Sequence, residues 1–99
     1  TFAAMLTAGM EGVREKIEPP ASIDKNIYHM TPEERTGVGI GTLPADLYAA
    51  HQALLADDLI CRALGPHVVE ALTSVAEAEW GSYRTAVHPW ELDRYLTTY

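Results

Sequence analysis

A histidine and a glutamate three positions apart are the first residues of this chain whose types and spacing could do chemistry. His67 and Glu70 would share one face of a helix, where an imidazole and a carboxylate could both reach a divalent metal ion. A metal site needs at least one more ligand, and the sequence places none beside them. We therefore interpret the pair as polar residues on the outer side of a helix and predict no metal site.

A second acidic group lies near the start of the chain. Glu11, Glu15 and Glu18 follow one another at steps of four and three, so they share a helix face and could attract a divalent ion. Arg14 and Lys16 are interleaved with them, and such mixed runs are usually solvated faces or salt bridges between subunits. We interpret the cluster in that way.

The remaining polar motifs do not assemble into a catalytic site. The other histidines have no cysteine partner and no HExxH pattern; they are His29, His51 and His88. Three alternating glycines, Gly37, Gly39 and Gly41, follow no strand and precede no GK[ST] helix, which argues against a nucleotide loop. We predict no catalytic, cofactor-binding or metal-binding residue within these 99 residues.

Apolar residues at three- and four-residue steps predict the helices that position these groups. The clearest stripe carries Val69, Leu72, Ala76, Trp80, Tyr83 and Val87. The predicted helices cover about 2–17, 44–55, 58–64, 66–87 and 89–97, with a loop over 18–43 that contains one short helical turn from Thr31 to Arg35. There is no convincing strand, so the expected fold class is mainly α.

The first and last helices carry apolar faces that need a surface to pack on. The first stripe runs from Phe2 through Leu6 and Val13 to Ile17 and stops at Pro19-Pro20. The last helix carries Trp90 and the stripe Leu92, Tyr95, Leu96 and Tyr99. A helix of about ten residues is marginal in water, so we expect this aromatic tail to be held by packing.

Composition limits the partners and the compartment. The net charge of −7 repels phosphate backbones and anionic lipid heads, and it excludes nucleic acid as a natural ligand. No apolar run approaches the about 20 residues of a membrane span. A single cysteine, Cys61, fits a reducing compartment, so a cytoplasmic location is expected. Because the chain has no initiator methionine and begins directly with the predicted apolar helix at Thr1-Phe2, we interpret it as a piece of a longer protein.

Three sequence blocks together point to a family. They are Ala3-Ala4-Met5-Leu6-Thr7-Ala8-Gly9-Met10-Glu11-Gly12, Asp24-Lys25-Asn26-Ile27-Tyr28, and Glu79-Trp80-Gly81-Ser82-Tyr83-Arg84 followed by Val87-His88-Pro89-Trp90-Glu91. In order and spacing they resemble the C-terminal end of a prokaryotic type I glutamine synthetase, over residues 1–99. The resemblance implies the helical C-terminal part of an α+β catalytic domain.

The resemblance also implies what the whole enzyme does and what this piece lacks. The parent would be an ATP-dependent glutamate–ammonia ligase that uses Mg²⁺ or Mn²⁺. The family's metal-binding and phosphate-contacting residues lie upstream of this segment, and the last of them lie on the strand that directly precedes it. No catalytic residue carries over onto these positions, and the isolated chain is expected to be inactive. Its expected roles are core packing, an active-site entrance loop and oligomer contacts.

Tyr28 is the residue with a regulatory counterpart in the resembling family. In some bacterial subtypes the tyrosine of a Lys-Asn-Leu-Tyr segment receives an AMP group that lowers activity. Here Ile27 replaces the leucine, and His29 and Met30 depart from the pattern of the modified subtype. We expect Tyr28 to lie exposed on a loop and to be unmodified, as in the feedback-regulated subtype.

The tail has a counterpart in the family's assembly. There the terminal helix reaches into a pocket of the opposing ring of a double hexamer, so the resemblance implies that Trp90, Leu92, Tyr95 and Leu96 contact a second subunit. Two alternatives stay open. The parent could be a γ-glutamyl ligase acting on a polyamine or another amine, or the chain could be a free-standing helical interaction module.

Overall fold

Several helices of this chain begin at a residue whose side chain caps the first turn. In the computed structural model, which describes residues 1–96 and 98, the Asp46 carboxylate accepts the backbone N–H of Ala49 at 2.7 Å. Asp57 caps the next helix in the same way. Thr31 and Glu34 form a capping box, in which each side chain accepts the other residue's backbone N–H. These contacts satisfy donors that the first helical turn leaves free.

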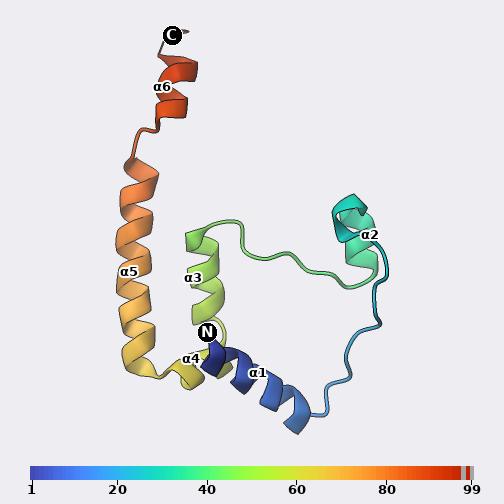
Figure 1. The fold of residues 1–99 in the computed structure, drawn as a ribbon. Helices are drawn as coiled ribbons and strands as arrows, with labels where there is room; N and C mark the ends of the chain where they lie inside the picture. Colours follow the sequence, from blue (N-terminus) through green and yellow to red (C-terminus); the bar gives the residue numbers. More distant parts are fainter. Residues whose placement is uncertain (97, 99) are drawn as a thin grey trace.

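The helices follow one another along the chain without a strand among the described residues (Figure 1). Their bounds are α1 Phe2–Arg14, the 3₁₀ turn η1 Ile27–His29, α2 Pro32–Gly37, α3 Leu47–Leu55, α4 Asp58–Leu64, α5 Pro66–Thr85 and α6 Pro89–Tyr95. The predicted mainly-α class is confirmed. The expected end of the last helix at residue 97, and Tyr99 in its stripe, lie outside the described residues.

Three predicted helices are shorter in the structure, and the turn in the loop is longer. The first ends at Arg14 rather than 17 because Lys16 adopts a left-handed conformation, with φ 54°. The second begins at Leu47 rather than 44 because Asp46 is its cap. The third main helix ends at Thr85 rather than 87, and the helical turn expected at 31–35 continues as α2 to Gly37.

The helices at the centre pack in series. α1 lies against α4, α4 contacts both α3 and α5, and α3 runs antiparallel beside α5 (Figure 1). Between α4 and α5, Gly65 takes φ 84°, a conformation that a residue with a Cβ rarely adopts, and Pro66 opens α5. α2 stands apart from the other helices at the end of two long connections, and α6 continues beyond α5.

This arrangement encloses no apolar core within the described residues. The only buried residue there is the polar His51, 7 % exposed. The radius of gyration is 18.9 Å, whereas a compact domain of this length would have about 13 Å. The segment therefore presents its apolar side chains to its surroundings.

Helix α1 shows this most clearly. The stripe that the sequence predicts as its packing face is exposed here, with Phe2 at 90 % and Val13 at 72 % exposed. The residues that lose exposure are small or polar ones such as Ala4, Thr7 and Glu11, on the side of α1 that packs against α4. The chain thus covers the small, polar side of α1 and leaves its apolar side without a partner within the described segment.

Candidate functional site

Tyr28 lies at the centre of the turn η1, on the long connection between α1 and α2. Its side chain is 97 % exposed, and its backbone N–H donates to Asn26 Oδ1 at 3.0 Å. The turn therefore fixes the backbone at this residue while the phenol extends into solvent. Exposure on a loop is as the sequence predicts, and modification of the hydroxyl stays a prediction.

The four tail residues expected to contact another subunit lie on or just after α6. Leu92, Tyr95 and Leu96 line a shallow apolar groove, and Trp90 and Leu96 are 62 % and 73 % exposed. The Trp90 ring meets Tyr95 edge to face at 5.8 Å, and the Arg94 guanidinium lies 5.5 Å from the Trp90 centroid. These contacts hold the Trp90 ring against its own helix.

The acidic groups considered as metal ligands stay apart. Within the described residues there is no group of three or more His, Cys, Asp or Glu side chains that could hold a metal ion. Glu11 instead accepts hydrogen bonds from the Arg14 guanidinium, at 2.9 Å from Nε. This contact, with the nearby Arg62 of α4 as a smaller influence, lowers the pKa of the Glu11 carboxyl below its ordinary value. Glu11 and Glu15 of the cluster thus both form ion pairs with Arg14 on the same helix face.

The seam between α3 and α5 is the site that sequence reasoning did not identify. His51 points from α3 into the seam, where its Nε2 lies 3.2 Å from Thr73 Oγ1 of α5. Its Nδ1 has no hydrogen-bond partner within residues 1–96 and 98. A buried imidazole is thus anchored at one nitrogen and open at the other.

Aromatic rings continue from this seam towards α6. Tyr48 stacks on Trp80 with ring centroids 6.1 Å apart, and Trp80 stacks on Tyr83 at 5.9 Å. Tyr83 in turn contacts the His88 ring at 5.0 Å, directly before α6 begins. The His88 backbone N–H donates to Glu91 Oε2 at 2.7 Å, which fixes the first turn of α6. The rings therefore connect the α3–α5 seam to the start of the tail.

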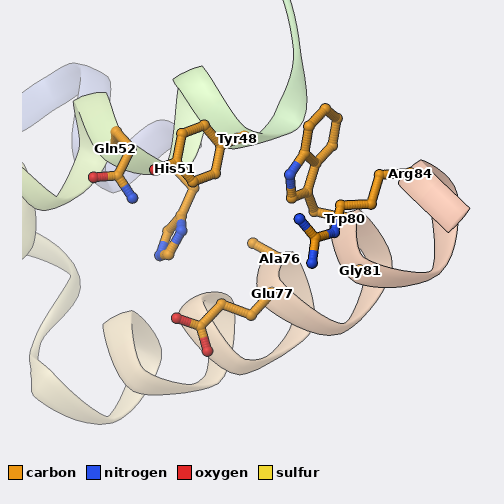
Figure 2. A pocket seen from close by; sticks show the side chains of 8 residues that line it. All are labelled: Tyr48, His51, Gln52, Ala76, Glu77, Trp80, Gly81 and Arg84. Carbon is orange, nitrogen blue, oxygen red and sulfur yellow. The ribbon is translucent and has the colours of Figure 1, made fainter.

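A cavity of about 150 Å³ opens at the same seam (Figure 2). Tyr48 and Trp80 form its aromatic wall. Its polar lining comes from both helices, with His51 and Gln52 on α3 and Glu77 and Arg84 on α5. Figure 2 shows that the His51 ring lies between the two helices and that the Arg84 guanidinium points from α5 towards the cavity. The Arg84 side chain has no ion pair or hydrogen bond within the described part of the chain.

The sequence carried a partial signal for this cavity. Trp80 and Ala76 belong to the predicted stripe of α5, and Leu47, Ala50 and Leu54 form an apolar stripe on α3 at steps of three and four. Tyr48 follows Leu47 and lies outside that stripe. Because the cavity depends on how far α3 is offset along α5, spacing within either helix could not place its lining residues together.

Among the described residues, no single helix is long and apolar enough to cross a membrane. One bent pair, α4 together with the segment Pro66–Tyr95 at an angle of 107°, meets the criterion of length and composition.

Comparison with known proteins places the chain in one family. A family model described as "Glutamine synthetase, catalytic domain" matches residues 1–95. A glutamine synthetase of Thermotoga maritima is 48% identical over 95 residues, which cover 96% of this chain and 22% of that protein. A glutamine synthetase of Thermus thermophilus is 46% identical over 98 residues, covering 99% of this chain and 22% of that protein. One of Methanosarcina mazei is 44% identical over 96 residues, covering 97% of this chain and 22% of that protein.

The match covers nearly all of this chain but only about a fifth of the length of each relative. Both the open arrangement of the helices and the exposed α1 stripe fit a segment that packs within a larger catalytic domain. The chain belongs to the glutamine synthetase family.

Proposed function

We propose that the protein containing this chain is an ATP-dependent ligase that joins ammonia to the γ-carboxylate of glutamate. The observation that carries the proposal is the match of residues 1–95 to the catalytic domain of glutamine synthetases, with 48% identity to a relative of that name. A carboxylate resists attack by an amine. Phosphorylation by ATP, with divalent cations neutralising charge, makes an acyl phosphate that ammonia can displace.

Within that enzyme, the proposed work of this chain is structural. The exposed stripe of α1, from Phe2 to Val13, would cover the active-site sheet of the parent, and the loop from 19 to 30 would line the entrance to the active site. Full burial of each large apolar side chain of that stripe would contribute about 1.5–3 kcal/mol, so the contact would be strong. ATP and Mg²⁺ or Mn²⁺ would bind to other parts of the parent protein. The parent would be located in the cytoplasm.

The tail is proposed to join subunits. Helix α6 presents Trp90, Leu92, Tyr95 and Leu96 at its surface, each between 45 % and 73 % exposed, and a second subunit would cover them. A double hexameric ring would repeat this contact by symmetry, so that a modest surface on one chain holds two rings together.

Tyr28 is proposed to be an unmodified residue of the entrance loop. Its 97 % exposure would let a transferase reach the hydroxyl, and a bulky anion there could obstruct the entrance. The departures at Ile27, His29 and Met30 favour the unmodified subtype. Intact mass of the full-length protein from cells grown with excess ammonium tests this, and an AMP-sized increment mapped to Tyr28 would refute it.

The activity is tested on the full-length protein by following phosphate release and glutamine formation from glutamate, ATP and ammonia. Glutamine formation that needs both ATP and a divalent cation is the expected result. Parallel reactions replace ammonia by a diamine or a polyamine. Turnover with the polyamine and none with ammonia would replace this proposal by the γ-glutamyl-amine ligase alternative.

A further inference from the structure

We propose that the cavity between α3 and α5 is a binding site for a small aromatic monocarboxylate, separate from the ligase chemistry. The site combines an aromatic wall of Tyr48 and Trp80 with the Arg84 guanidinium, which has no ion-pair partner within the described residues. The chain has a net charge of −7, yet this guanidinium points into the cavity and pairs with none of the described carboxylates. It can therefore bind an anion from outside the chain.

The size and walls of the cavity select the ligand's body. Its volume is about 150 Å³, and an apolar cavity of about that size accommodates one benzene ring. Tyr48 and Trp80, stacked at 6.1 Å with an interplanar angle of 27°, offer ring faces and edges to a planar group. A planar ring with one substituent at each end therefore fits better than a flexible chain.

The two ends of the cavity differ in charge. Glu77 and Arg84 are seven residues apart on α5, which separates them by about 10 Å along the helix axis. A carboxylate fits the Arg84 end, where the planar guanidinium can donate two parallel hydrogen bonds. Glu77 repels a second carboxylate at the other end, whereas a hydroxyl there can donate to Glu77, and it can donate to or accept from the open Nδ1 of His51 according to the tautomer.

The anchored histidine gives the site a fixed lining. His51 is 7 % exposed, and its contact with Thr73 holds the ring in the seam while Nδ1 stays available. A ligand hydroxyl meeting this nitrogen would gain a hydrogen bond without ordering a flexible side chain, which lowers the entropic cost of binding.

The test uses 4-hydroxybenzoate as the probe on the full-length protein, by calorimetry and ligand-observed NMR. A saturable site with a Kd of about millimolar is expected, because ligands of about ten non-hydrogen atoms seldom bind more tightly through one charge pair. Arg84→Gln should weaken binding about tenfold or more, since the charge-assisted hydrogen bonds are lost. Arg14→Gln is the matched control: it makes the same charge change at an exposed ion pair outside the cavity, and binding should stay as in the wild type.

A dicarboxylate tests the other end of the cavity. Terephthalate should bind the wild type at least about tenfold more weakly than 4-hydroxybenzoate, because Glu77 repels its second carboxylate, and Glu77→Gln should narrow that difference. If Arg84→Gln does not fold, Arg84→Lys replaces it and should weaken binding several-fold, since lysine lacks the planar fork.

Three results would overturn the proposal. The first is that the wild type shows no saturable binding of the probe up to about 10 mM. This result would also be obtained if another part of the parent fills the cavity. The second is equal binding by the wild type and the folded Arg84 variant. The third is equal binding of terephthalate and 4-hydroxybenzoate to the wild type.

Discussion

At the scale of single residues, the C-terminal ends of α1 and α2 have the same hydrogen-bond pattern but different residue types at the key position. At the end of α1, the N–H of Ile17 donates to the carbonyl of Gly12 at 2.9 Å and the N–H of Lys16 to that of Val13 at 3.2 Å. This is a Schellman motif, which requires a left-handed residue after the helix. Lys16 occupies that position at φ 54°, where a Cβ is unfavourable.

Two substitutions with opposite expected effects on stability test whether the left-handed conformation of Lys16 is strained. Lys16→Gly should raise the free energy of unfolding by up to about 1 kcal/mol, because glycine adopts the left-handed conformation without strain. The same position after α2 is already Gly39, at φ 76°, so Gly39→Ala should lower stability by about as much. Thermal unfolding of the full-length variants measures both, and a shift of the same sign in the two would contradict the explanation.

The ion pair of Glu11 and Arg14 predicts a pH dependence. Hydrogen bonding to Arg14 holds the pKa of Glu11 below its ordinary value of 4.5 in the folded chain. A carboxyl whose pKa is lower when folded stabilises the fold above the unfolded-state pKa and loses that contribution as the pH falls through the folded one. The difference in Tm between the wild type and Arg14→Gln should therefore be largest near neutral pH and shrink below about pH 4.5. A difference that grows on acidification would contradict it.

At the scale of helices, the sequence predicts an element best where a characteristic residue marks each of its ends. α4 has both Asp57 before it and Gly65 after it, and its observed bounds are those expected. Pro44 is typical of a first helical residue and predicts a start of α3 that is too early, because the Asp46 carboxylate caps the helix. The early end of α1 depends on the left-handed Lys16, a conformation that its residue type does not indicate.

The partners of the helix faces were harder to predict than the helices. A stripe identifies the apolar side of a helix but contains no information about what covers it. For α1 the chain's own contact uses the small side around Thr7, and the stripe containing Phe2 stays exposed. The seam cavity depends likewise on the offset of α3 against α5, which no spacing within one helix specifies.

Helix α6 gives a prediction at this scale. Deletion of residues 88–99 from the full-length protein should release single rings while each ring keeps its fold, because the deleted surface is the proposed contact between rings. The double variant Leu92→Ala/Leu96→Ala should cause partial dissociation, and Asp93→Asn on the same helix is the matched control. Light scattering measures the assembly, and an intact double ring after the deletion would show that the tail covers only its own subunit.

At the scale of the whole chain, the open arrangement argues against a free-standing module. Folding must offset a loss of conformational entropy of about 1–2 kcal/mol for each ordered backbone residue, and buried apolar surface supplies most of that. Within the described residues no apolar side chain is buried, and the radius of gyration of 18.9 Å exceeds that of a compact domain. We therefore expect the chain to need surfaces outside itself in order to fold stably.

The isolated chain should therefore lack cooperative unfolding. Circular dichroism should show helical signal, mostly from the long helix α5, that decreases gradually on heating, because independent helices melt without a shared core. The full-length protein should unfold in a sharp transition under the same conditions. A sharp thermal transition of the isolated chain, with native-like near-UV signal, would contradict the prediction.

The contact between α1 and α4 has a consequence for how the chain tolerates a break. η1, α2 and α3 all lie between these two helices in the sequence, so their contact closes a long loop. A protease cut in the exposed connection after α1 would leave every helix whole and remove only the tether. The tether keeps α1 close to α4 at an effective concentration of about millimolar. After the cut, the two pieces would stay together only if the parent's surface binds α1 strongly enough to replace the tether.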